Sequence, residues 1–359
     1  MILADYALSD ILILPGKILG YTPCNTALIR HKGELLYQTR YVSYSKHLTN
    51  HKFNPYMFLS NQHNYDDNGL GYFNSKNVRY DGKGTTEIIY DEGLLTQFRG
   101  FEDVRLVEWD GELYCYGTRP DLYYDKYVMC LYRGDERCVM RSPFDCGVEK
   151  NWMAVPNHPR RFIYGFEGKT VICIDVDEKG EVYNIQRVKQ NVNETLSGIR
   201  GSTPLIEYQG GYLTMVHKQF YEDHQTWYRH AFIYFDKNFK ILQMSNWFFF
   251  HNPLCEFCIG MIIDEGVLKM TYSQFDAFPS EMCLDLCVLD NILCRKIFGY
   301  YNIDIDYFEN IFTTLYEYGY EQAYKAVANF ILLNKQIAVL LDTYINDLDI
   351  KKLLIHKYD

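Results

Sequence analysis

The chain has 359 residues, a net charge of -10 and an aromatic content of 16%. A chain of this length can form one large domain or two ordinary ones. Its negative charge and its lack of Lys/Arg clusters argue against nucleic-acid binding, because phosphate contacts need such clusters. Its 33 tyrosines and 22 phenylalanines favour a β-rich fold, and exposed aromatic rings offer flat surfaces to sugars or bases.

The N-terminal segment has no positively charged region ahead of an apolar run. No stretch reaches the roughly 18 uninterrupted apolar residues of a membrane span. The eleven cysteines, scattered from Cys24 to Cys294, are typical of reduced thiols in a cytosol. We therefore expect a cytoplasmic protein without a membrane span. Residues 1 to about 20 alternate apolar and polar side chains around Pro15, which predicts an edge or closing strand.

One pattern recurs along the chain: a polar residue, a short apolar strand, a Gly-containing turn and a second strand. Five copies begin near residues 25, 102, 149, 201 and 256. Further strand patterns, such as residues 127–132 and 231–236, lie between the copies. A hairpin plus a second strand pair about every fifty residues is typical of the four-stranded blades of a β-propeller. The sequence thus predicts an all-β, five-bladed β-propeller, with residues 61–86 as an inserted loop in the long first interval.

From Asp304 onward the apolar residues fall at helical spacing. This change predicts a propeller domain over residues 1–300 and a C-terminal helical extension over residues 301–359. The helices can pack on the propeller or form a homo-oligomer.

Four cysteines call for consideration as a zinc site: Cys255 and Cys258, followed by Cys283 and Cys287. The second pair is separated by three residues, and the first lies beside a strand pattern. This arrangement favours buried thiols over zinc ligands, so we expect no metal.

Polar residues open each copy of the pattern, and the first strand of each propeller blade lines the central channel. These residues are therefore expected to converge on one axial pocket. A single Asp before a strand is usually a turn cap, and a single His is usually solvated. Recurrence at the same place in several blades favours a functional role. The candidates are Asn25, Glu102, Asp103, Arg105, Lys150, Asn151, Arg200, His217, Tyr272 and Asp276.

Four segments, in order, resemble the motifs of one family of five-bladed propellers. Residues 100–105 (GFEDVR) are similar to a Glu-Asp-Pro-Arg element, and residues 149–152 (EKNW) to a Glu-Lys-Asn-Trp element. Residues 201–206 (GSTPLI) with His217 resemble a Gly-rich, Pro-containing strand that ends in His. Residues 272–276 (YSQFD) resemble a Tyr-Gly-x-x-Asp element. The family is glycoside hydrolase family 130, the β-mannoside phosphorylases, with the related β-1,2-mannosyltransferases.

The resemblance implies an inverting reaction at an anomeric carbon, with Asp103 as the general acid or base. In the family this aspartate acts through a sugar hydroxyl, without a second carboxylate as nucleophile. Arg105 and Lys150 can keep Asp103 ionised or bind an anionic leaving group. Trp152 and Tyr272 offer aromatic faces to a pyranose ring.

Two positions depart from the family pattern. Val104 replaces the usual proline, and the third blade offers Lys150 and the residues around Glu167 where the phosphorylases carry two phosphate-binding arginines. The first departure leaves Asp103 and Arg105 in place. The second favours transfer of mannose from a sugar nucleotide such as GDP-mannose to a carbohydrate acceptor, forming a β-mannoside that we expect to be β-1,2-linked. The residues expected to contact the diphosphate are Arg105, Lys150, Arg200 and His217.

Other functions stay open. The same pocket can serve a β-mannoside phosphorylase or hydrolase, and either way the co-substrate is a sugar nucleotide or phosphate, with no bound cofactor. A non-catalytic carbohydrate-binding propeller is a further alternative. A glycosidase with two catalytic carboxylates is disfavoured, because Asn25 occupies the position in the first blade where an acid is needed.

Overall fold

The computed structural model describes residues 3–13, 22–42, 44–49, 52–58, 73–81, 86–89, 98–121, 126–144, 146–192, 195–222, 225–251, 256–274 and 278–294. The chain divides into two compact units, Met1–Leu293 and Cys294–Asp359. The helices expected over residues 301–359 lie outside the described residues, so they and the division at residue 300 stay predictions.

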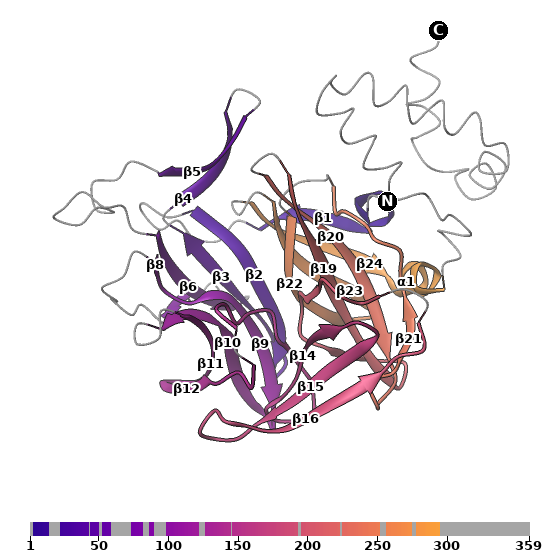
Figure 1. Ribbon diagram of the computed structural model, residues 1–359. Coiled ribbons are helices and arrows are strands. Elements are labelled where there is room, and N and C mark those ends of the chain that lie inside the picture. The colour runs from indigo at the N-terminus through magenta and orange to yellow at the C-terminus, as the bar shows by residue number, and fades with distance from the viewer. Residues whose placement is uncertain are drawn as a thin grey trace, which may run out of the picture. The chain divides into compact units, whose positions relative to one another are not determined.

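Five antiparallel sheets follow one another along the first unit, which confirms the predicted five-bladed β-propeller (Figure 1). In each blade the first strand of the repeated pattern is the innermost strand, and later strands add outward. The first blade consists of β2 (Thr22–His31), β3 (Glu34–Val42), β6 (Phe73–Asp81) and β7 (Thr86–Ile89), with β8 (Phe98–Arg99) paired in parallel to β6.

The second to fifth blades repeat this plan without a long interruption. The second contains β9 (Glu102–Trp109), β10 (Glu112–Asp121), β11 (Lys126–Arg133) and β12 (Glu136–Met140). The third contains β13 (Met153–Ala154), β14 (Arg161–Glu167), β15 (Thr170–Val176) and β16 (Val182–Lys189). The fourth contains β17 (Ile199–Gly201), β18 (Ile206–Tyr208), β19 (Gly211–Glu222), β20 (Gln225–Phe235) and β21 (Ile241–Met244). The fifth contains β22 (Glu256–Asp264), β23 (Val267–Gln274) and β24 (Phe278–Asp285).

The N-terminal segment closes the ring of blades. Strand β1 (Ser9–Leu12) pairs antiparallel with β24 and becomes the outermost strand of the fifth blade, which confirms the predicted closing strand. The short 3-10 helix η1 (Leu3–Tyr6) precedes it, and the amides of Leu3 and Ala4 donate hydrogen bonds of 2.8 and 3.0 Å to the carbonyls of Phe249 and Phe250. The two ends of the propeller sequence are thus joined within one sheet.

The predicted inserted loop over residues 61–86 lies partly outside the described residues, at 61–72 and 82–85, and the prediction is wrong for residues 73–81. Residues 73–81 form β6, which pairs with β3 as a regular blade strand. The extra residues of the first blade come before β6, where β4 (Tyr44–Thr49) and β5 (Lys52–Phe58) pair with each other as a separate two-stranded sheet. Strand β6 therefore lies in a stretch whose Asn, Gly and Tyr content is typical of a loop.

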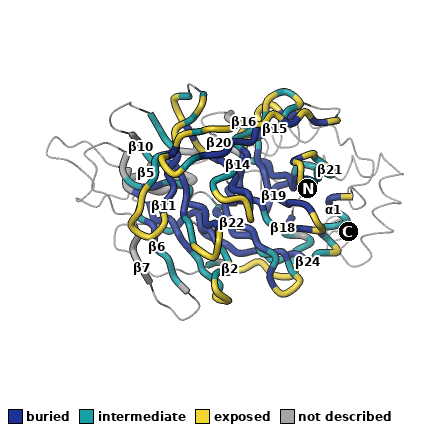
Figure 2. Tube along the Cα trace, turned by 90° about the horizontal axis from the view of Figure 1, so that it is seen from below, coloured by how far each residue is buried: buried dark blue, intermediate teal, exposed yellow. Residues whose placement is uncertain are grey.

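The apolar core lies between neighbouring blades, and buried segments gather in the middle of the molecule while turns are exposed (Figure 2). Between the second and third blades, the rings of Trp109 and Phe162 meet edge to face with centroids 5.7 Å apart. Similar buried clusters join the third blade to the fourth, and the first blade to the second and fifth. Such contacts remove large aromatic surfaces from water and fix each blade against the next.

Within the described residues there is one α-helix, α1 (Leu286–Leu293), and no helix is long and apolar enough to cross a membrane. The described residues also contain no group of three or more His, Cys, Asp or Glu that could hold a metal ion. Among the four cysteines considered above, Cys258 is buried in β22, while Cys283 is half-buried and Cys287 exposed. Cys255 lies outside the described residues.

Candidate functional site

A pocket of about 130 Å³ opens where residues of all five blades meet. Most of the lining residues lie on or next to the inner strands of their blades. Its lining consists of Asn25, Arg40, Glu102, Asp103, Lys150, Asn151, Arg200, His217, Tyr228 and Phe257. The structure thus brings together seven of the residues singled out in the sequence: Asn25, Glu102, Asp103, Lys150, Asn151, Arg200 and His217.

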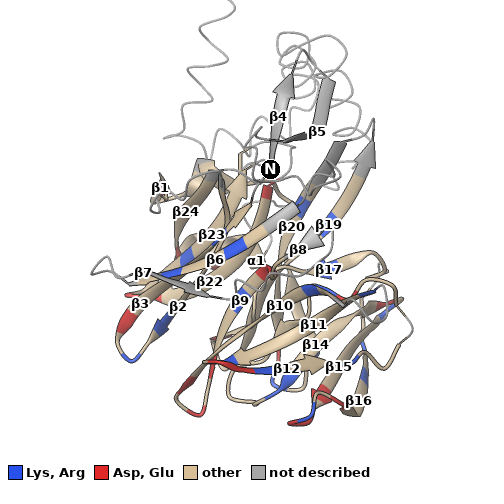
Figure 3. Ribbon diagram, turned by 90° about the vertical axis from the view of Figure 1, so that its left-hand side faces the viewer, with Lys and Arg blue, Asp and Glu red and all other residues tan. Residues whose placement is uncertain are grey.

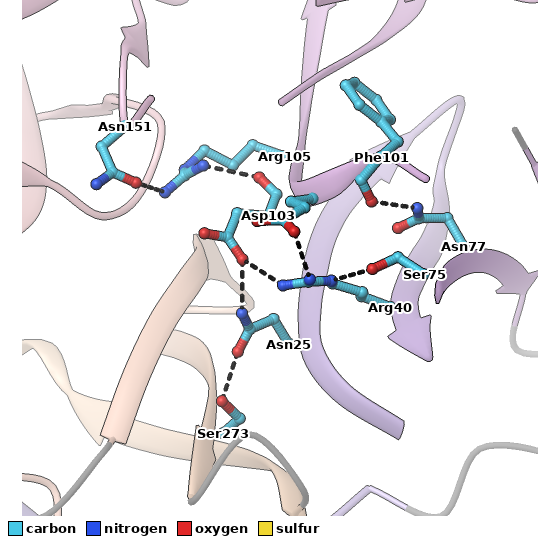
Figure 4. Close-up of polar contacts among 10 residues, drawn as sticks. Asn25, Arg40, Ser75, Asn77, Phe101, Asp103, Arg105, Asn151 and Ser273 are labelled. Carbon is cyan, nitrogen blue, oxygen red and sulfur yellow. Dashed lines mark hydrogen bonds and ion pairs between the residues drawn. The ribbon is translucent and has the colours of Figure 1, made fainter. Parts of the chain in front are cut away.

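Asp103 lies in a polar network that joins residues of the first, second, third and fifth blades (Figure 4). Asn25 Nδ2 donates a 2.9 Å hydrogen bond to Asp103 Oδ1, and the guanidinium of Arg40 lies 3.2 Å from the same oxygen. Arg40 also forms a 3.2 Å ion pair with Glu102 and donates to Ser75 Oγ at 2.9 Å. The Asp103 carboxylate is therefore oriented by groups from the first blade.

The pKa of the Asp103 carboxyl is held below its ordinary value. Burial by itself raises this pKa, but the charges of Arg40, then Arg105 and Lys150, and the hydrogen bond from Asn25 together outweigh burial. In the free protein at neutral pH, Asp103 is a carboxylate. It can accept a proton directly, and it can act as an acid only after taking up a proton.

Arg105 does not line the pocket, contrary to the expectation that it binds a leaving group. Its side chain is fully buried, and its three nitrogens donate to Ser202 O, Asp103 O and Asn151 Oδ1 at 2.5, 2.7 and 3.1 Å. These acceptors occupy the guanidinium from three sides. Arg105 still favours the ionised form of Asp103 through its charge.

His217 lines the pocket as a neutral side chain. Burial is the main cause that lowers its pKa well below the ordinary value, and the nearby His230, Arg105, Arg200 and Lys150 add to this effect. Its Nδ1 lies 2.9 Å from Ser202 Oγ. A neutral imidazole can exchange hydrogen bonds with a sugar hydroxyl. A neutral imidazole adds no positive charge to the pocket.

The aromatic residues expected to stack on a sugar are placed elsewhere. Trp152 is fully buried in the core of the third blade, where its Nε1 donates to Glu149 Oε2 at 3.0 Å. Tyr272 is also buried, stacked on Phe250 with centroids 4.1 Å apart and bonded through its hydroxyl to Asp10 at 2.9 Å. Neither ring lines the pocket, since the motifs give the position of an aromatic residue along the chain but not the direction of its side chain.

Two other aromatic residues reach the pocket instead. Tyr228 and Phe257 line it, with ring centroids 5.4 Å apart, and both rings meet His217 edge to face. Phe257 sits one residue after the start of the fifth copy of the repeated pattern. Position in that copy was the signal that could have identified it, whereas Tyr228 comes from β20, a strand that the pattern does not mark as inner.

Trp152→Phe separates a core role from a sugar-binding role. The change leaves Glu149 Oε2, on a side chain that is 5% exposed, without its indole donor. We expect the free energy of unfolding to fall by about 1–3 kcal/mol, the cost of an unsatisfied buried group, with KM unchanged. Chemical denaturation and steady-state kinetics measure both. Tyr228→Ala serves as the comparison: it should raise KM with a smaller effect on stability, and a raised KM in Trp152→Phe would contradict its placement in the core.

Arg40 is the main pocket residue that the sequence did not identify. It lies on β3, the second strand of its blade, and its side chain is 6% exposed. The last five residues of this strand are all buried in the structure, and a buried charge needs partners. Asp276, predicted near the same pocket, lies outside the described residues.

The charges around the pocket are mixed. Arg40, Lys150 and Arg200 are cationic, and Glu102 and Asp103 are acidic. Lys150 and Arg200 are exposed, whereas Arg40 is buried against the two carboxylates. Over the molecule as a whole, basic and acidic residues are interspersed along the described strands and turns (Figure 3). The pocket therefore pairs a half-buried, oriented carboxylate, Asp103, with two cations open to solvent.

No protein-family model matches the chain, and no curated protein matches its sequence. In fold it is similar to β-1,2-mannobiose phosphorylase from Listeria innocua, at 12% identity over 78% of this chain and 95% of that one, with a TM-score of 0.48. It is also similar to MPT-4, a mannose phosphorylase from Leishmania mexicana in complex with phosphate ion, at 14% identity over 78% and 88% of the two chains and a TM-score of 0.46.

A third similar structure comes from the GH130 family of mannoside phosphorylases. This family contains glycoside hydrolases that target β-1,2 mannosidic linkages in Candida mannan. The identity is 10% over 74% of this chain and 84% of that chain, with a TM-score of 0.45. This is the family that the sequence motifs resemble.

Proposed function

We propose that the chain is an inverting, β-mannoside-active enzyme that uses inorganic phosphate as co-substrate, with Asp103 as its general acid. The observation that carries the proposal is the pairing of one oriented carboxylate, Asp103, with the exposed cations Lys150 and Arg200 in the same pocket. A carboxylic acid can protonate a leaving oxygen, and cations on the pocket wall can hold an attacking anion.

We propose phosphate as the co-substrate, in place of the sugar nucleotide that the sequence favours. Of the four residues assigned to a diphosphate, Arg105 is buried with its nitrogens already bonded, and His217 is neutral. A small anion with one sugar ring fits this cation set better than a nucleotide.

The reaction that we propose exchanges one bond at the anomeric carbon. The phosphate oxygen forms a bond to this carbon as the bond to the glycosidic oxygen breaks on the opposite face, so a β-mannoside gives α-mannose 1-phosphate. Asp103 supplies the proton that the leaving oxygen takes up, through a sugar hydroxyl as the family resemblance implies. The proton that phosphate loses restores the acid, so protons balance over the cycle.

Incubation with β-1,2-mannobiose and other β-mannosides, with and without inorganic phosphate, tests this proposal. We expect mannose 1-phosphate, detected by phosphorus NMR, to form only when phosphate is present. Release of free mannose at the same rate without phosphate would identify a hydrolase. Product formation from GDP-mannose and an acceptor alone would identify a transferase, and binding without turnover would identify a carbohydrate-binding propeller.

A further inference from the structure

Two pocket residues on neighbouring blades have backbone conformations that side chains rarely adopt. Asp103 has φ of 48° and Asn151 has φ of 66°. Asp and Asn tolerate this left-handed region better than most residues, but it persists only where the surroundings impose it. The direction of the Asp103 carboxylate thus depends on whatever holds this stretch of backbone.

A β-bulge accounts for the conformation of Asp103 on one side. Arg105 pairs with Tyr116 and Glu102 with Thr118, so Asp103 and Val104 together face the single residue Gly117. A Cβ atom at Gly117 would lie 2.5 Å from the carbonyl oxygen of Glu102, closer than atoms can approach. Gly117 therefore permits the bulge, and bulges are a known means of redirecting a side chain.

Arg105 accounts for the other side. Its guanidinium donates 2.7 Å to the carbonyl oxygen of Asp103 and 3.1 Å to Oδ1 of Asn151, so one side chain contacts both left-handed residues (Figure 4). Its Nε donates to the carbonyl of Ser202 in the fourth blade. The rigid fork of Arg fixes these acceptors relative to one another across three blades.

We propose that Arg105 is a positioning residue: it holds the bulged backbone of the second blade so that the Asp103 carboxylate meets Asn25 and Arg40 in the pocket. The inference rests on the proposed function in that Asp103 is the group being positioned. Arg105 itself is not among the residues that line the pocket. Its motif position, two residues after Asp103, follows from the need to reach back to the Asp103 carbonyl across the bulge.

Arg105→Lys tests the role because it keeps the positive charge but removes the fork. We expect kcat on a β-mannoside with phosphate to fall about tenfold to a hundredfold while KM stays within about twofold. Arg161→Lys is the matched control, since Arg161 forms a two-point ion pair with Asp175 within the third blade. It should lower thermal stability without lowering kcat. Equal kcat in Arg105→Lys and wild type would overturn the proposal.

Gly117→Ala disturbs the same bulge while leaving Arg105 intact. We expect a similar loss of kcat, and the double variant Arg105→Lys/Gly117→Ala should lose less than the product of the two single effects, because both act through one segment. Full independence of the two effects would contradict a shared positioning role. This second variant also keeps the test open if Arg105→Lys does not fold.

A measurement without turnover separates this inference from the proposed function. Carbon-13 NMR titration of the Asp103 carboxyl reads its contact with Asn25 and Arg40 whether or not a substrate is known. We expect its pKa to rise in both Arg105→Lys and Gly117→Ala, although both variants keep a positive charge at position 105, and to stay unchanged in Arg161→Lys. An unchanged pKa in both bulge variants would overturn the positioning role, whereas a rise without any β-mannoside turnover would count only against the proposed function.

Discussion

Asp103→Asn is expected to lower kcat about a thousandfold and to leave the fold intact. The amide cannot donate or accept the proton that moves in the reaction, and general acid-base catalysis contributes roughly 10²- to 10⁴-fold. The replacement has the same shape, its oxygen can still accept from Asn25 and Arg40, and Asn tolerates the left-handed backbone at this position. Initial rates and circular dichroism spectra measure the two parts of the expectation.

Glu102→Gln is the matched control for this experiment. It makes the same chemical change in the neighbouring residue, which lines the pocket and pairs with Arg40 at 3.2 Å. We expect a smaller decrease in kcat than for Asp103→Asn. Wild-type activity in Asp103→Asn would mean that Asp103 is not the acid. A large loss of kcat in Glu102→Gln without such a loss in Asp103→Asn would mean the same.

The sequence was sufficient to predict the propeller because each blade repeats a physical pattern. Inner strands such as β9 and β22 combine apolar residues with a tight Gly-containing turn, and this combination survives where individual residues vary. The first blade was harder to interpret, since β4 and β5 interrupt it between β3 and β6. A strand that pairs across an insertion has no local signal of its partner, so β6 was mistaken for loop.

For the candidate site, the order of the strands was enough to predict which residues lie near the pocket. It was not enough to predict which of their side chains point into it. Asp103, Lys150 and His217 reach the pocket because they lie near inner strands. Trp152 and Tyr272 lie in the same motifs but turn into the core. Local irregularities are one reason that side-chain direction is hard to predict: a single extra residue in a strand, such as the bulge at Asp103, redirects the side chains next to it.

Arg40 could not be assigned to Asp103 from the sequence because 63 positions separate them and the contact exists only after two blades pack. Arg40 is the first of the cations that lower the pKa of Asp103 against the opposing effect of burial. After Asp103→Asn, the largest effect is therefore expected from removal of the Arg40 charge, which should change the pH dependence of the reaction. Arg40→Gln removes the charge and retains a side chain of similar reach.

The sign of the effect follows from the ionised form. Without the Arg40 charge the carboxylate is less stable, so the pKa of Asp103 rises. Phosphorolysis needs the protonated acid, so kcat/KM falls with rising pH above this pKa, and in Arg40→Gln the falling limb should move to higher pH. Synthesis from mannose 1-phosphate needs the carboxylate, and its rising limb should move to higher pH as well. At a fixed pH on the falling limb the protonated fraction of Asp103 rises, and at a fixed pH on the rising limb its carboxylate fraction falls, about tenfold for each unit by which the pKa rises.

Profiles of kcat/KM against pH in both directions test this expectation, with Arg79→Gln as the control. Arg79 lies in the same blade but donates to Gln38 and Cys115, and it does not contribute to the lowered pKa of Asp103.

The same linkage acts on stability: a carboxylate with a lowered folded-state pKa stabilises the fold above its unfolded pKa and loses this contribution as pH falls through the folded value. The difference in unfolding free energy between wild type and Arg40→Gln should therefore shrink on acidification. Limbs that stay in place in Arg40→Gln would show that Asp103 is not the group that the profile reports.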